Sequence, residues 1–307
     1  MNTKQQSSPD PKLLYTLSIL PIVIALVIAW LLPREPLDPV VQAAPSMQQV
    51  QAANAARLES IFAEYGYTWP PDGAVPPLAV TTFPEDMVDL DTEERRAMFF
   101  RTLLPLAMAE NERMLRLREE VTQLESRLQE EGREPDAEEQ DWLRSLFEHF
   151  RLSGDPMAAD DREALLRRMD VIPVSLALAQ AANESGWGTS RFTREANNLF
   201  GEWTWTAETG LLPERRAEGA THFVRSFPTL AASVRSYVRN LNSHPAYQPL
   251  RDIRTRLRAN DQEITGTELA AGLERYSERG EAYIREIRAM IRQNRLEELE
   301  PDLELEQ

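Results

Sequence analysis

The sequence AQAANESGWGTSRFTREANNLF, from Ala179 to Phe200, decides the predicted fold of this chain. It begins with an apolar helix of small residues that leads to a single carboxylate, Glu184. The helix then ends at Ser185-Gly186-Trp187-Gly188, because glycine is common just past a helix end. An acid at the end of an apolar helix loses water, and this desolvation raises the pKa of a carboxyl group. A carboxylic acid that stays protonated near neutral pH is what protonation of a glycosidic oxygen requires.

The helix that precedes the acid is predicted to start at Val174, because Pro173 stands at the favoured first-turn position for proline. Ala177, Ala181 and Glu184 share one face of this helix at helical spacing. The alanines allow a neighbouring helix to pack closely, so we expect Glu184 to lie at the base of a groove.

The composition excludes several classes of protein. The 307 residues carry a net charge of −16, whereas nucleic-acid binders normally present a basic field. The absence of cysteine excludes disulfides, iron–sulfur clusters and thiol catalysis. The three histidines form no ligand pair of the HExxH kind, so we expect no catalytic metal and no cofactor.

Residues 13–32 form an uncharged apolar run of 20 residues, long enough to span about 30 Å of hydrocarbon as a helix. The alternative is a cleaved signal peptide, but the run is long and the small-residue sites that follow are too distant for ordinary cleavage. Lys4 and Lys12 predict that residues 1–12 are cytoplasmic. We therefore expect a single-pass protein of the inner membrane whose C-terminal domain faces the periplasm.

The remaining chain divides by composition into segments. We predict a Pro/Ala/Gln-rich spacer and irregular segment over 33–90, which contains a short helix over 57–65, and a globular unit that starts near Asp91. After it come a helical N-terminal part (91–169), a catalytic domain (170–296) and an acidic, disordered tail (297–307). Periodicity and caps predict helices over 91–131, 135–150, 160–169, 174–184, 189–195, 229–242, 265–273 and 281–296.

Between residues 199 and 227 the pattern changes to aromatic residues with partial alternation, which predicts a short β-hairpin. The predicted fold is therefore mainly α, with a small β-hairpin lobe, preceded by a long helix and the N-terminal transmembrane helix.

Two motifs, QAANESGWG at 180–188 and NNLFG at 197–201, resemble the bacterial glucosaminidase family, also called mannosyl-glycoprotein endo-β-N-acetylglucosaminidase-like. The resemblance is nearest to its membrane-associated Bax-type branch. Supporting motifs follow in order up to about Met290, at 171–175, 210–213, 236–242, 244–247 and 276–283. The resemblance implies a lysozyme-like α+β domain that hydrolyses peptidoglycan.

The resemblance also implies roles for particular residues. Glu184 matches the general acid of the family, which would protonate the leaving oxygen of a β-1,4 bond after N-acetylglucosamine. Tyr276 matches a tyrosine that the family places in the cleft, where it would steady the N-acetyl group or the transition state. The family draws a second acid from its β-lobe, where this chain offers Glu218, then Glu214, and also Glu202 and Glu208. The alternative is attack by the substrate's own N-acetyl group, which needs no second protein group.

Five further residues are candidates for substrate binding, each with a structural alternative. Trp187 either packs against the acid or belongs to the core, and Asn198 is expected to order the loop beside Glu184. Phe200 and Trp203, together with Trp205, are candidates for a platform on which sugars stack, or are packed within the lobe. Tyr237 has the spacing of a core residue. The set is Trp187, Asn198, Phe200, Trp203 and Tyr237.

These observations predict an endo-β-N-acetylglucosaminidase whose partners are peptidoglycan strands and, through residues 13–32, the inner membrane, with no nucleic acid. Because the second carboxylate is unassigned, a non-catalytic glycan-binding or scaffold protein on the same fold is the first alternative. A lytic transglycosylase, which also needs one acid, is the second.

Overall fold

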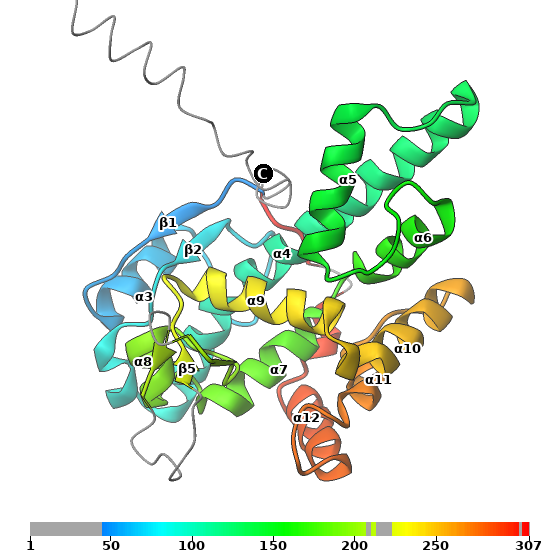
Figure 1. Ribbon diagram of the computed structural model, residues 1–307. Helices are drawn as coiled ribbons and strands as arrows, with labels where there is room; N and C mark the ends of the chain where they lie inside the picture. Colours follow the sequence, from blue (N-terminus) through cyan, green and yellow to red (C-terminus); the bar gives the residue numbers. More distant parts are fainter. Residues whose placement is uncertain (1–44, 207–209, 213–222, 301–302, 307) are drawn as a thin grey trace, which may run out of the picture. The chain divides into compact units, whose positions relative to one another are not determined.

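The computed structural model describes residues 45–206, 210–212, 223–300 and 303–306 (Figure 1). The chain forms two units, Met1–Asp38 and Pro39–Gln307, and every described residue lies in the second. Within these ranges no helix has both the length and the apolar character that a membrane crossing needs. The predicted membrane helix at 13–32 lies outside the described residues.

The fold is mainly α, as predicted. The described part contains these helices: α3 (Ala55–Glu64), α4 (Thr92–Glu131), α5 (Ala137–His149), α6 (Ala159–Arg168), α7 (Val174–Ser185), α8 (Arg191–Ala196), α9 (Leu230–Ser243), α10 (Gln248–Ala259), α11 (Gly266–Leu269) and α12 (Glu281–Gln293). Short 3-10 turns connect them: η1 (Glu85–Asp89), η3 (Pro245–Tyr247), η4 (Ala270–Leu273) and η5 (Leu296–Glu298).

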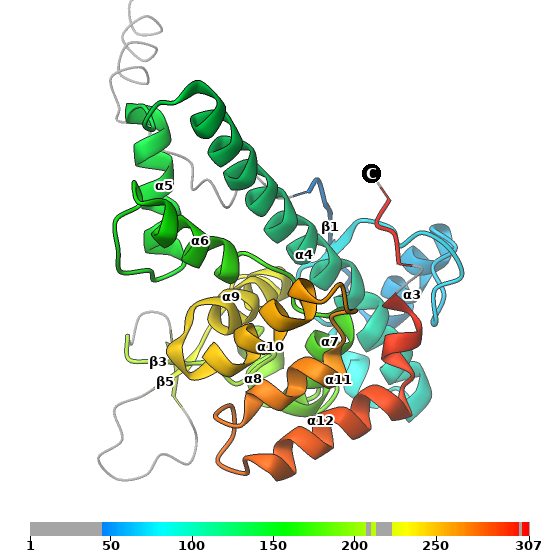
Figure 2. The same ribbon diagram turned by 90° about the vertical axis from the view of Figure 1, so that its right-hand side faces the viewer.

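Helix α7 lies at the centre of the core. Its residues from Val174 to Ala182 are all buried, which is the pattern of a helix covered on every side. Figure 2 shows α7 between α4 and the α11–α12 pair, and α7 packs against all three. The small side chains of Ala177, Ala179 and Ala181 allow this close approach.

The segment from residue 47 to 90 corrects the predicted spacer. The short helix expected at 57–65 is confirmed by α3, but the segment as a whole packs into the same core as α4 and α7. Strand β1 (Gln48–Val50) pairs in parallel with β2 (Leu78–Val80), whose three residues are buried. Leu58 and Phe62 of α3 are fully buried as well. The globular unit therefore begins well before Asp91, because these scattered apolar residues bury together only in the tertiary structure.

The acidic tail was predicted to be disordered, and this is wrong for its described residues. The Glu300 carboxylate accepts a hydrogen bond from the Ser175 backbone N–H in the first turn of α7, where helix N–H groups lack partners and favour negative charge. Leu305 forms a parallel bridge with Val75, and Leu303 and Leu305 pack against the core.

The predicted β-hairpin is a three-stranded antiparallel sheet in the described residues. Strands β3 (Trp203–Thr204) and β4 (Gly210–Leu211) both pair with β5 (Phe223–Arg225), in the order β3-β5-β4. Helix α10 was not predicted, although Pro249 stands in its first turn and is a usual sign of a helix start.

The junction between α6 and α7 is fixed by buried charges. The carboxylate of Asp170 accepts hydrogen bonds from Arg258, with 2.6 Å from Nε to Oδ2, and lies 3.6 Å from Nε of the fully buried Arg254. Asn242 of α9 donates to the Asp170 carbonyl at 2.9 Å, and Asn111 of α4 pairs with both the N–H and the carbonyl of Ile172. The boundary predicted between 169 and 170 therefore does not separate two parts, because α4, α9 and α10 all hold this junction.

We expect Asp170→Asn to lower the free energy of unfolding by about 3–5 kcal/mol, because it leaves the Arg254 guanidinium buried without its counter-charge. Burial opposes ionisation of Asp170, but Arg258 and Arg254 hold its pKa below the usual 3.8. A lowered carboxyl pKa stabilises the fold above the unfolded-state pKa, and this contribution is lost as the pH falls through the folded value.

Denaturant unfolding between pH 7 and pH 2 measures both effects. The matched control is Asp141→Asn, which removes an exposed ion pair with Arg144 and is expected to change stability by less than about 0.5 kcal/mol. Similar costs for the two variants at pH 7 would show that the Asp170 network is not a stabilising element.

Candidate active site

The chain turns sharply where α7 ends. Gly186, Trp187 and Gly188 all have left-handed backbones, with φ of 57°, 61° and 79°. A Cβ at Gly188 would lie 3.1 Å from the Phe83 ring, and its N–H donates to Ser185 Oγ at 2.9 Å. The ESGWG sequence therefore forms a rigid turn that ends α7 and leaves Glu184 half-buried in the last turn of the helix.

Trp187 faces α4. Its ring makes edge contacts with Phe99 and Phe100, at centroid distances of 5.7 and 5.2 Å, and the Arg96 guanidinium lies 4.9 Å above it. These contacts account for the left-handed backbone at a bulky residue, since the packing of the ring compensates the strain. They favour the core alternative for Trp187, while substrate binding by this residue stays a prediction.

Four tyrosines from different parts of the chain surround Glu184: Tyr237 of α9, Tyr247 of η3, Tyr276 after η4, and Tyr283 of α12. Burial is the largest cause of a raised pKa at all four, and the negative charge of Glu184 contributes at each; the pKa of Tyr247 rises to about 12. All four phenols are thus protonated at neutral pH and available as hydrogen-bond donors.

A directed chain of hydrogen bonds reaches Glu184 from the core. The Tyr237 hydroxyl donates to Gln180 Oε1 at 2.7 Å, and Gln180 Nε2 donates to the Tyr283 hydroxyl at 2.8 Å. The Tyr283 proton is then free to be donated to the Glu184 carboxylate, with which this hydroxyl is hydrogen-bonded. Asn183 adds a second donor, with 3.2 Å from Nδ2 to Glu184 Oε1. These donors orient the carboxylate from the protein side.

Aromatic rings form the layer beneath this carboxylate. Phe200 stacks on Tyr237 at a centroid distance of 3.9 Å, and Tyr276 stacks on Tyr283 at 5.3 Å. The Tyr276 hydroxyl donates to the Phe200 carbonyl at 3.3 Å. Phe200 and Tyr237 are both buried, so they support the site from below, and only the half-buried Tyr276 reaches its surface.

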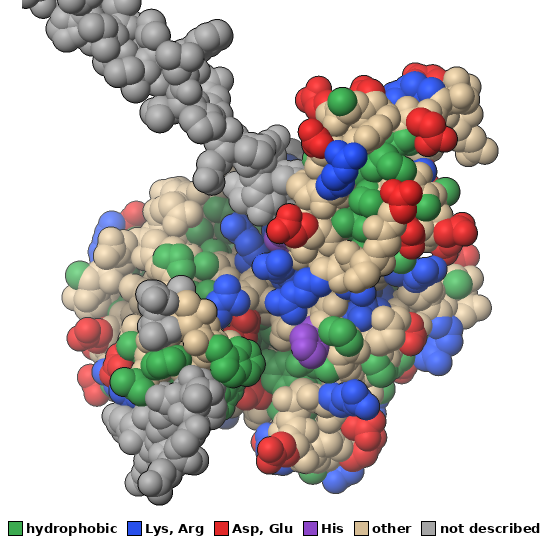
Figure 3. Space-filling view, in the orientation of Figure 1, with side chains coloured by type: hydrophobic (Ala, Val, Ile, Leu, Met, Phe, Trp, Pro, Cys, Tyr) green, Lys and Arg blue, Asp and Glu red, His purple; other side chains and the backbone are tan. Residues whose placement is uncertain are grey.

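The β-lobe borders the other side, and Figure 3 shows the surface hollowed between this lobe and α12. Asn198 is buried, as expected for a residue that orders the loop; its Nδ2 donates to the carbonyls of Glu202 and Arg225, both at 2.8 Å. Trp203 and Trp205, in contrast, are 52% and 75% exposed. Of the predicted stacking residues, these two are the ones with exposed rings.

Of the four candidates for the second carboxylate, Glu208, Glu214 and Glu218 lie outside the described residues. Glu202 is described, and its side chain is only 15% exposed. The Ser236 hydroxyl donates to its Oε2 at 2.7 Å, and Arg225 Nη1 lies 3.4 Å from the same oxygen. Burial raises the pKa of Glu202, although Ser236 and Arg225 lower it. The charges of both Glu202 and Glu184 raise the pKa of Tyr247, so the two acids border one tyrosine.

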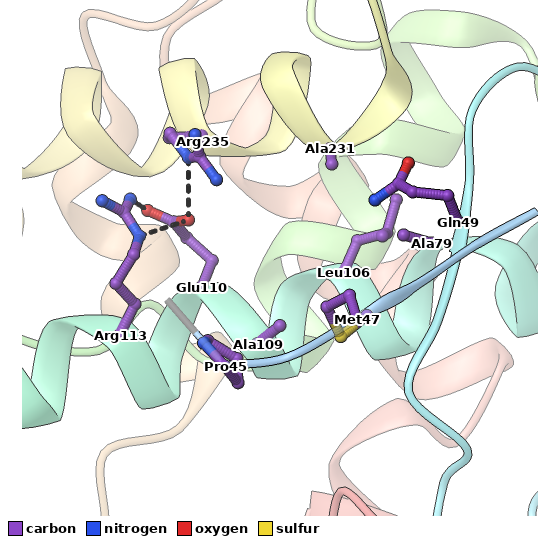
Figure 4. Close-up of a pocket in the computed structure, with 10 residues that line it drawn as sticks. All are labelled: Pro45, Met47, Gln49, Ala79, Leu106, Ala109, Glu110, Arg113, Ala231 and Arg235. Atoms are coloured by element: carbon purple, nitrogen blue, oxygen red, sulfur yellow. Dashed lines mark hydrogen bonds and ion pairs between the residues drawn. The ribbon is translucent and has the colours of Figure 1, made fainter. Parts of the chain in front are cut away.

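A separate cavity of about 280 Å³ lies between β1, α4 and α9. In Figure 4 Glu110 stands between Arg113 and Arg235, and Arg113 Nε donates to its Oε2 at 3.0 Å. None of the predicted site residues lines this cavity. In the described ranges no cluster of three His, Asp or Glu side chains is arranged to hold a metal ion.

Residues 159–296 match the model of the family Glucosaminidase, described as mannosyl-glycoprotein endo-beta-N-acetylglucosaminidase. This part of the chain is a glucosaminidase-family domain. The glucosaminidase domain is also similar to Protein bax of Escherichia coli (strain K12), with 41% identity over 130 residues, which are 42% of this chain and 46% of that protein. The chain thus matches less than half the length of this curated relative. No solved structure matches the chain.

The predicted resemblance is therefore confirmed, and a glucosaminidase-type glycosidase is the class of enzyme that the domain supports. The matched range starts at α6, so α4 and the β1–β2 pair are additional to it although they share its core. The lysozyme-like fold stays a prediction.

We expect Tyr283→Phe to lower the free energy of unfolding by about 1–3 kcal/mol, because Gln180 Nε2, which is fully buried, loses its acceptor. The same substitution at the exposed Tyr65 is the control and is expected to stay within about 0.5 kcal/mol. In a Gln180→Met background the cost at Tyr283 should be smaller, because only the hydrogen bond with Glu184 is then lost. Equal costs with and without Gln180, measured by denaturant unfolding, would contradict the hydrogen-bond chain.

Proposed function

We propose that this chain is a peptidoglycan hydrolase that cleaves the β-1,4 bond after N-acetylglucosamine, with Glu184 as the general acid. The observation that carries the proposal is the position of Glu184: a half-buried carboxylate at the end of the central helix, which receives donors from Asn183 and Tyr283 and is ringed by tyrosines. The family match supports the reaction class.

The geometry suggests how the acid works. Asn183 donates to Oε1 and Tyr283 is hydrogen-bonded to the same carboxyl group, so the group that passes its proton to the glycosidic oxygen is held in a fixed orientation. Once the proton has left, Glu184 is an anion, and the hydrogen bonds from Tyr283 and Asn183 are charge-assisted and stronger. Donors that are already oriented toward a developing charge favour the transition state over the ground state.

The opposite side of the sugar ring needs a second group or the substrate's own N-acetyl group. We propose Glu218 of the β-lobe for this role, as the family resemblance implies. Tyr276, half-buried beside Tyr283, is proposed to steady the N-acetyl group or the oxocarbenium-like transition state. The other acid of this region, Glu202, is already hydrogen-bonded by Ser236 and paired with Arg225. These contacts favour a positioning role for Glu202 over that of base or nucleophile.

Glu184→Gln is expected to lower the rate of glycan cleavage by about 10²–10⁴-fold, since it removes the general acid but keeps the shape of the side chain. Zymography on peptidoglycan tests this, with Glu163→Gln on the exposed face of α6 as a control that clears like the wild type. Equal clearing by wild type and Glu184→Gln would refute the assignment.

Mass analysis of the products separates the proposed activity from its alternatives. A new reducing-end N-acetylglucosamine supports the proposal, whereas an anhydro sugar identifies a lytic transglycosylase. Glycan binding without any product identifies a non-catalytic scaffold.

Replacing Trp203 and Trp205 together by alanine is expected to raise KM for glycan about tenfold and to leave kcat within about twofold, because exposed aromatic faces contribute to binding by covering the apolar faces of sugars. Leu115→Ala, which truncates an exposed apolar side chain of α4, is the control. A fall in kcat with unchanged KM would argue against a stacking platform.

We also propose that residues 13–32 anchor the chain in the inner membrane and that the glucosaminidase domain faces the periplasm, where its substrate lies. The uncharged apolar run and the lysines that precede it support this placement.

A further inference from the structure

Basic side chains gather along one side of α9, although the chain as a whole carries a net charge of −16. Figure 3 shows Lys and Arg side chains over α9 and toward α6 on this face. The described arginines whose contacts place them here are Arg151, Arg168, Arg225, Arg239 and Arg251. A local positive field on an acidic protein points to an anionic ligand.

Hydrogen bonds fasten the turn after α5 to this side of α9. Arg239 Nε donates to the His149 carbonyl at 2.8 Å. Arg168 Nη1 donates at 3.0 Å to the carbonyls of both Arg151 and Ser243. Arg239 and Ser243 follow Ser236 along the same helix face, and Ser236 is the residue that holds Glu202. The turn that carries Arg151 therefore lies beside the Glu202 edge of the site.

Arg151 differs from its neighbours in how its side chain is used. The residue is exposed, and its backbone is left-handed with φ of 55°, a conformation that costs energy for a residue with a Cβ. Among the described residues its guanidinium makes no hydrogen bond or ion pair. Its positive charge nevertheless acts on two neighbouring groups, Glu202 and His244. Burial raises the pKa of Glu202 and lowers that of His244, and the charge of Arg151 lowers both pKa values.

The other charged groups of this cluster already have partners. Arg168 and Arg251 donate to backbone carbonyls, and Arg225 is paired with Glu202, which Ser236 also holds. Among the described arginines of this cluster, Arg151 is therefore the one whose guanidinium donors are unused. Glu202, on which its charge acts, is already hydrogen-bonded by Ser236 and paired with Arg225. A planar guanidinium with free donors suits a carboxylate or phosphate.

We propose that Arg151 binds a carboxylate carried by the glycan strand, on the lactyl group of a muramyl sugar or on the peptide attached to it. The inference rests on the proposed function and adds specificity for acidic glycan. Glu202 and Glu184 both border Tyr247, so Arg151 lies at the Glu202 end of the groove in which Glu184 acts. A strand that passes Glu184 would bring the substituents of a neighbouring sugar to this end.

Binding by the full-length Glu184→Gln variant tests the proposal without turnover. The probes are soluble glycan strands that carry peptides, strands from which an amidase has removed the peptides, and peptide-bearing strands whose carboxylates have been converted to carboxamides. We expect strands that carry the bound carboxylate to bind about tenfold more tightly than the carboxamide strands, as a charge-assisted contact would give. These are the peptide-bearing strands if the carboxylate is on the peptide, and the amidase-treated strands if it is on the lactyl group, because removal of the peptide frees the lactyl carboxylate from its amide bond.

Adding Arg151→Asn should remove this preference, and Asn is chosen because it tolerates a left-handed backbone. Arg151→Lys, which keeps the charge but not the fork of donors, should retain part of it. Arg144→Gln on α5 is the matched control and should leave the preference intact. Tight binding of amidase-treated strands places the carboxylate on the lactyl group, and its loss places the carboxylate on the peptide.

Two results would overturn the proposal: neither the peptide-bearing nor the amidase-treated strands bind more tightly than the carboxamide strands, or the preference survives Arg151→Asn. Failure of the proposed function has a different signature, because wild-type protein would then yield no cleavage products while the Arg151-dependent preference persists.

Discussion

The buried ion pair of Asp170 with Arg254, which Arg258 joins from the surface, is the constraint on which the site depends. Charges inside a protein are tolerated only when they are paired and hydrogen-bonded, so this cluster admits one arrangement of α6, α7, α9 and α10. It fixes where α7 begins. Because α7 is a helix of 12 residues, about 18 Å long, fixing its start also fixes where Glu184 stands at its other end.

At the C-terminal end of α7, polar side chains of α7, α9 and α12 form one chain of hydrogen bonds. Gln180 is fully buried on α7, and its amide can satisfy both its oxygen and its nitrogen only if Tyr237 of α9 and Tyr283 of α12 are in place. The same contacts that make the core uniquely packed therefore point a phenolic donor at Glu184. Structural requirements and the proposed catalytic role therefore meet in one hydrogen-bond chain, which explains why Glu184 lies on the most buried of the described helices.

The segments outside the matched family range complete the domain. Helix α4 and the β1–β2 pair pack onto the helices of the glucosaminidase domain, and Trp187 is held by Phe99 and Phe100 of α4. The tail returns to cap α7 through Glu300. The turn after α5 brings Arg151 to the Glu202 edge of the site. These additions give the glucosaminidase domain further packing contacts and, we infer, a preference for acidic glycan.

The sequence by itself determined the helices other than α10, the end of α7 after Glu184 and the family resemblance, because periodicity, caps and the ESGWG motif are local signals. It placed Glu184 at a helix end and Asn198 in a loop that it orders. Only the tertiary structure decided that Tyr237 and Phe200 lie beneath the site, that Trp187 faces α4, that Glu202 and Glu184 border the same tyrosine, and that Arg151 lies beside Glu202. Those outcomes depend on contacts between residues far apart in the chain, whose burial and pairing free energies exist only once the helices have packed.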